Sequence, residues 1–93
     1  MRLSPVDRQA IKETIKEFDS NADVYLFGSR TDDSKRGGDI DLLIMSKKIT
    51  ERDRRNIRLK LFDRIGEQKI DLIIASDPTI PFVKIALSQG LIL

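Results

Sequence analysis

The stretch that decides the fold is residues 39–45, which read Asp-Ile-Asp-Leu-Leu-Ile-Met. After its first residues this run is continuously apolar, as is typical of a strand buried on both faces. Two other short runs favour strands: residues 24–27 read Val-Tyr-Leu-Phe, and residues 70–75 read Ile-Asp-Leu-Ile-Ile-Ala. The sequence therefore predicts three strands.

Three helical patterns surround these strands. The first is predicted to begin after Ser4, a typical N-cap, with Pro5 at the first helical position. The second is predicted to begin at Thr50 and to end at Gly66, and the third covers residues 82–87 and closes at Gly90. The residues predicted to face inward are, in the first helix, Val6, Ala10, Ile11, Ile15 and Phe18 and, in the second, Ile57, Leu61, Phe62 and Ile65.

The order of these elements is helix, strand, loop, strand, helix, strand, helix. It predicts an α+β fold, an α/β sandwich in which helices pack against a small sheet. A length of 93 residues is enough for one domain, which we assign to residues 1–93. Residues 30–38 contain no apolar side chain and are predicted to form a loop, whereas the apolar end, residues 91–93, is either a buried strand or an interface.

The composition excludes several kinds of chemistry. There is no cysteine and no histidine, so disulfide frameworks, thiolate zinc sites and Ser-His-Asp catalysis are excluded. Seventeen basic and fifteen acidic residues give a net charge of only +2, which by itself does not indicate a nucleic-acid partner. No apolar run is long enough to span a bilayer and no signal peptide is evident, so we expect a cytoplasmic protein that does not enter a membrane.

Acidic residues open two of the predicted strands. Asp39 and Asp41 are two positions apart, so in a strand they project from the same face with about 7 Å between their backbones. If the strand that carries Asp71 lies beside theirs, the third carboxylate completes an acidic pocket, which requires a cation such as magnesium to offset its charge. Each carboxylate taken alone has another explanation, as a solvated strand end or an ion-pair partner.

A glycine-serine turn follows the first strand. Gly28 allows a ligand to approach the backbone closely, Ser29 offers a hydroxyl group, and Arg30 offers a planar charged group suited to phosphate. An ordinary turn and a solvated arginine are the alternatives. Nothing in the spacing of Lys35 and Arg36 connects them to this site.

These residues together resemble a known signature. Gly28-Ser29, followed by Asp39-Ile40-Asp41, is similar to the G-S-x-D-x-D pattern of the DNA polymerase β-like nucleotidyltransferases, and in particular of the minimal nucleotidyltransferases (MNT) of prokaryotes. The resemblance covers nearly the whole chain, because Asp71 falls where the family has its third carboxylate and residues 80–91 resemble the family's C-terminal segment. It implies a small mixed sheet with flanking helices.

The resemblance also implies roles for these residues. Asp39 and Asp41 would bind two magnesium ions that bridge a nucleoside triphosphate, and Asp71 would complete the metal site and help to activate the attacking hydroxyl group. Gly28 and Ser29 would hold the β- and γ-phosphates. The reaction would be an in-line displacement at the α-phosphorus with release of pyrophosphate, which needs neither histidine nor cysteine.

The chain has no segment left over to hold an acceptor, so we expect another protein to provide it. In the MNT family the implied partner is a HEPN-domain RNase toxin, and the implied activity is that of an antitoxin which transfers AMP from ATP to a tyrosine of the toxin. Two alternatives remain open: a non-catalytic module that neutralises its partner by contact, and a nucleotidyltransferase that acts on tRNA or a small molecule.

The second helix is crowded with positive charge. Its basic residues are Arg52, Arg54, Arg55, Arg58, Lys60 and Arg64. They are typical either of a solvated helix with ion pairs along its surface or of a face that docks an acidic partner or nucleic acid. The chain has no tryptophan and few aromatic residues, which argues against a stacking platform for single strands, so we favour a protein partner over direct nucleic-acid binding.

Overall fold

The computed structural model describes residues 3–27, 40–66 and 69–93. It contains helix α1 (Pro5–Phe18), strand β1 (Asp23–Phe27), strand β2 (Ile40–Met45), helix α2 (Glu51–Ile65), strand β3 (Ile70–Ala75), helix α3 (Pro81–Gln89) and strand β4 (Leu91–Ile92). The α+β fold class predicted from the sequence is confirmed.

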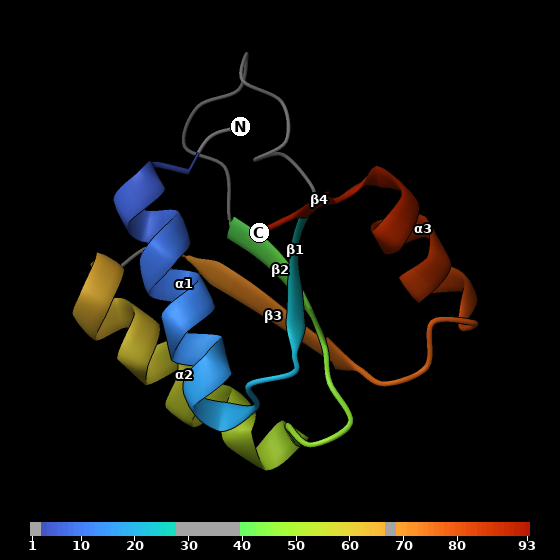
Figure 1. Cartoon of the computed structure of the whole chain (residues 1–93), viewed down its shortest axis with the longest axis horizontal. Coiled ribbons are helices and arrows are strands. Elements are labelled where there is room, and N and C mark those ends of the chain that lie inside the picture. The colour runs from blue at the N-terminus through green and yellow to red at the C-terminus, as the bar shows by residue number, and fades with distance from the viewer. Residues whose placement is uncertain (1–2, 28–39, 67–68) are drawn as a thin grey trace.

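The strands form one mixed sheet in the order β3-β2-β1-β4. β2 and β3 are parallel, because α2 crosses between them, whereas β1 is antiparallel to both β2 and β4. Figure 1 shows α1 and α2 side by side next to the sheet and α3 apart from them. β4 is a fourth strand beyond the three predicted: it pairs with β1 at the edge of the sheet, and both of its residues are exposed, so it is not a buried strand. Leu93, which follows it, is buried.

The two faces of the sheet carry cores of different size. The larger core joins one face to α1 and α2 through the fully buried residues Ile11, Ile15, Leu26, Ile40, Leu42, Ile44, Ile57 and Leu61, together with others around them. The smaller core lies on the α3 side, where its buried members are Leu43, Val83 and Ala86. Leu42 and Leu43 are neighbours in β2 and point to opposite cores, so β2 is buried on both faces as predicted.

The helix boundaries follow the capping signals in the sequence. The Ser4 hydroxyl accepts a hydrogen bond from the backbone N–H of Asp7 at 3.1 Å, which fixes the start of α1. At the start of α2 the carboxylate of Asp53 accepts from the backbone N–H of Thr50 at 3.0 Å. α2 ends at Gly66, whose φ of 87° is readily adopted only by glycine.

One prediction about α1 is wrong. Val6 was expected on the buried face but is 76% exposed. At 3.6 residues per turn, Val6 lies about 140° around the helix from Ile11, so it cannot share the Ile11–Ile15 face. The position that completes this face is Thr14, which is fully buried; its hydroxyl donates to the carbonyl of Ala10 at 2.7 Å and accepts from Nη1 of Arg64 at 2.8 Å.

Candidate active site

Two of the predicted carboxylates lie side by side at one end of the sheet. Asp41 and Asp71 are partners in the parallel register of β2 and β3, each at the second position of its strand. Hydrogen-bonded strands are about 4.8 Å apart, and residues in register on parallel strands point to the same face. The sheet itself therefore sets the separation of these two carboxylates.

The face that carries them is the α3 side of the sheet. Asp41 alternates with Leu43, which belongs to the smaller core, and Asp71 alternates with Ile73, which packs against the same core. Asp41 is half-buried and Asp71 is exposed. α3 packs on this face through Val83 and Ala86, which share the smaller core with Leu43 of β2. That core begins two positions further along β2 and β3 than the two carboxylates.

The register continues into β1. Phe27, the last residue of β1, is the partner of Asp41, so Asp71, Asp41 and Phe27 form one row across three strands. Gly28 and Ser29 follow Phe27 directly in the sequence, and Asp39 precedes β2. The predicted site residues Gly28, Ser29, Arg30 and Asp39 lie outside the residues that the structure describes, as do Lys35 and Arg36.

The described part of this site suits a hard cation. Asp41 and Asp71 supply carboxylate oxygens from neighbouring strands, and oxygen ligands favour magnesium, calcium or manganese over zinc or copper. Within the described ranges no group of three or more acidic, histidine or cysteine side chains gathers as a metal site. Asp41 and Asp71 are thus the two members of the predicted acidic trio that the structure describes.

Comparison with known families shows which family the chain belongs to. The polymerase beta nucleotidyltransferase family model matches residues 9–93. The chain belongs to the polymerase beta nucleotidyltransferase family. No curated protein matches the chain significantly. Among the described helices of this nucleotidyltransferase, none is long and apolar enough to cross a membrane.

The basic residues of α2 divide into two sets. Arg64 and Lys60 form ion pairs with Glu17 of α1, and Arg54 pairs with Glu51 within the helix. The hydrogen bonds from Arg64 and then Lys60 lower the pKa of Glu17 from 4.5 to about 2, and the same contact raises the pKa of Arg64. The two pairs with Glu17 tie α2 to α1, and all three pairs accord with the structural explanation of the basic helix.

The second set has no such partner. Arg52, Arg55 and Arg58 form no ion pair with any other residue in the described part of the chain, and Arg52 and Arg55 are exposed. Beside them Leu59 is also exposed, on the side of the helix turned away from the core. This part of α2 of the nucleotidyltransferase lies on the opposite side of the sheet from Asp41 and Asp71.

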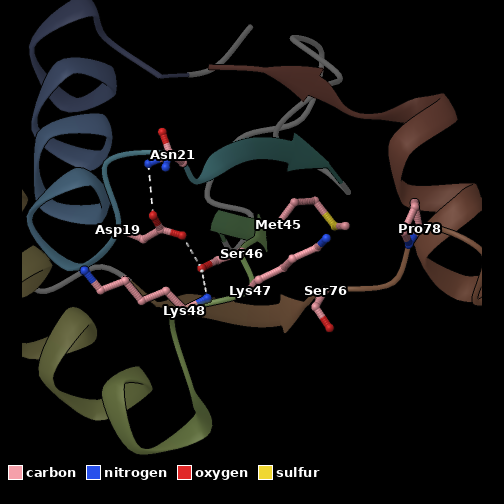
Figure 2. A pocket seen from close by; sticks show the side chains of 8 residues that line it. All are labelled: Asp19, Asn21, Met45, Ser46, Lys47, Lys48, Ser76 and Pro78. Atoms are coloured by element: carbon pink, nitrogen blue, oxygen red, sulfur yellow. Dashed lines mark hydrogen bonds between the residues drawn. The ribbon is translucent and has the colours of Figure 1, made fainter.

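A groove of about 630 Å³ opens at the other end of the sheet, where β2 and β3 finish. Figure 2 shows its central contact, in which the hydroxyl of buried Ser46 donates to the carboxylate of buried Asp19 at 2.6 Å. The same hydroxyl accepts from the backbone N–H groups of Lys48 and Ile49, and Asp19 also accepts from the N–H of Asn21. The hydrogen bond from Ser46, followed by that from the N–H of Asn21, lowers the pKa of Asp19.

Sequence reasoning missed this contact because Asp19 and Ser46 are 27 residues apart. The only local signal was the turn composition of residues 19–23, which predicts a break in the chain and not a long-range bond. The contact fixes the end of α1 against the segment that enters α2. We assign it a structural role, since its polar atoms already satisfy one another.

Proposed function

We propose that this nucleotidyltransferase is an antitoxin of the MNT type, which transfers AMP from ATP to a hydroxyl group, that of a tyrosine, on a HEPN-domain RNase toxin in the cytoplasm. The observation that carries the proposal is the register of Asp41 with Asp71, which places two carboxylates on the same face of the sheet. The sequence adds the glycine-serine turn directly after the neighbouring strand β1.

The proposal gives each predicted site residue a role in the transfer. Asp39, Asp41 and Asp71 would hold two magnesium ions, and Gly28, Ser29 and Arg30 would hold the phosphates. Bound magnesium supplies charge stabilisation for the entering and leaving oxygens. The acceptor oxygen bonds to the α-phosphorus, the bond from this phosphorus to the bridging oxygen of the β-phosphate breaks, and pyrophosphate leaves with the electron pair. A carboxylate oxygen of Asp71, the more exposed of the described pair, receives the proton of the hydroxyl group.

Intact-mass spectrometry tests this proposal. The protein is incubated with ATP, magnesium and the protein encoded by the neighbouring gene, which the proposal expects to carry a HEPN domain. The wild-type chain should add one or more AMP units to that protein, and Asp41→Asn, which keeps the side-chain shape and removes the charge, should add none. Asp23→Asn is the matched control, because exposed Asp23 lies at the opposite end of the sheet. An unmodified partner in the wild-type reaction would refute AMP transfer to that protein.

A second candidate function is neutralisation by contact alone, and the exposed arginines of α2 favour it. Arg52 and Arg55 have no described ion-pair partner, so they are available to an acidic surface. If contact suffices, Asp41→Asn should still form the complex and still block the toxin. If transfer is required, this variant should form the complex and leave the toxin active. Transfer to tRNA or a small molecule would appear in the same experiment as labelled nucleic acid or metabolite with an unmodified partner.

A further inference from the structure

An aromatic pair continues the row of carboxylates across the sheet. The ring of Phe27, the register partner of Asp41, meets the ring of Phe82 in α3 edge to face, with centroids 6.1 Å apart and an interplanar angle of 78°. Phe82 remains 49% exposed. An aromatic contact with one half-exposed ring therefore adjoins the row that holds the two carboxylates. Figure 1 shows α3, which carries Phe82, apart from α1 and α2.

The packing of α3 does not account for this exposure. Val83 and Ala86 close the smaller core and are 3% and 4% exposed, so they already anchor the helix. Phe82 adds one edge contact with Phe27 and keeps about half of its surface in water. A large aromatic ring stabilises a core chiefly through the area it buries, so the exposed half of this ring contributes little to folding.

The position of the ring suits one part of a nucleotide. Each step from Asp71 to Asp41 to Phe27 crosses one strand spacing of about 4.8 Å, so Phe27 begins about two spacings from Asp71. Phosphates held beside the carboxylates would leave the nucleoside to extend along the face. Phe82 adjoins Phe27, with ring centroids 6.1 Å apart, and its exposed ring suits a flat, uncharged group.

We propose that Phe82 is the surface on which the base of the nucleotide substrate stacks. The inference rests on the proposed nucleotidyl transfer and adds the base-binding residue to it. Every base has a π face that can stack on an aromatic ring, and a purine covers more of the ring than a pyrimidine does. Phe82 thus favours purine nucleotides through the larger contact area. It forms no hydrogen bond with the edge of the base and so does not distinguish one purine from the other.

Nucleotide binding with and without a base tests the proposal. Calorimetry with magnesium compares a non-hydrolysable ATP analogue with inorganic tripolyphosphate, which has no base. Phe82→Ala should weaken binding of the analogue about 5- to 150-fold, the range typical of one lost stacking contact, and should leave tripolyphosphate binding unchanged. Phe82→Leu keeps the apolar contact with Phe27 and should weaken the analogue nearly as much. Leu59→Ala, which removes an exposed apolar side chain from α2, is the matched control and should change neither ligand.

Fluorescence gives a second reading that does not depend on affinity. The chain contains no tryptophan, so Phe82→Trp introduces a single indole whose emission the stacked base should quench, whereas tripolyphosphate should not.

Unchanged binding of the analogue by Phe82→Ala would overturn the inference and leave the proposed transfer intact. Loss of transfer without loss of analogue binding would also overturn it, because the ring would then serve the acceptor. A wild-type chain that does not bind the analogue would overturn both proposals.

Discussion

Leu42 and Leu43 offer a direct comparison of the two cores. Both are fully buried leucines in β2, but Leu42 faces the core under α1 and α2, and Leu43 faces the core under α3. Replacing either by alanine removes the equivalent of three methylene groups, about 2.4 kcal/mol of transfer free energy. The cost above that value depends on how far the neighbours collapse into the cavity, and measured Leu→Ala costs span roughly 2.7–5.0 kcal/mol.

The structure predicts which variant lies at which end of this range. Leu42 is surrounded by long helices that are also joined by the Glu17–Arg64 ion pair, so its cavity should stay open and Leu42→Ala should cost about 4–5 kcal/mol. The nine-residue α3 can move toward the sheet, so Leu43→Ala should cost only about 2.5–3 kcal/mol. The difference of about 1–2.5 kcal/mol corresponds to roughly 4–20 °C in Tm for a domain of this size.

Urea unfolding followed by circular dichroism measures both free energies, since the wild-type m-value should hold for each variant. An equal or larger loss for Leu43→Ala would refute the argument, because it would mean that α3 is held as rigidly as the helices of the larger core. Leu43→Ala should also shift nucleotide affinity more than Leu42→Ala does, since Leu43 packs under α3, which carries Phe82.

Two further predictions concern stability. Because Arg64 helps to hold the pKa of Glu17 at about 2, below its ordinary 4.5, the ion pair stabilises the fold fully above pH 4.5 and is lost as the pH falls toward 2. Glu17→Gln should therefore lower Tm at pH 7 but not at pH 2, in melts that use Glu13→Gln as the control, and an equal loss at both pH values would contradict this explanation. Gly90→Ala should lower the free energy of unfolding by about 1–3 kcal/mol, because the added Cβ would lie 2.7 Å from the carbonyl oxygen of Ala86. Urea unfolding measures this loss, and an unchanged free energy would show that the backbone at the end of α3 can shift without cost.

Much of the fold could be predicted from local patterns in the sequence. Capping at Ser4 and the glycine at 66 mark helix ends because their effect acts within one turn. Continuous apolar runs mark buried strands for an equally local reason. The Val6 error came from extending an apolar stripe backwards by residue type without following its angle around the helix.

The candidate site could be predicted only in part. The sequence indicated that Asp41 and Asp71 belong together, provided that their strands are neighbours, and the structure places them in register. The contact of Phe27 with Phe82 joins residues 55 positions apart, and in the sequence Phe82 has the ordinary pattern of a helix core residue. Such a contact depends on where α3 packs on the sheet, and no local pattern in the sequence determines that position.

The pairing of β2 with β3 makes the assembly of the two carboxylates all-or-none. A slip of one residue between these strands would turn one carboxylate toward α1 and α2 and leave the other on the α3 side. A small change in a loop cannot bring Asp41 and Asp71 back together, because the backbone hydrogen bonds between β2 and β3 fix their relative positions. Under the proposed mechanism, a chain with a shifted register would lack transferase activity altogether. The specific activity of a preparation would then report the fraction of correctly folded molecules.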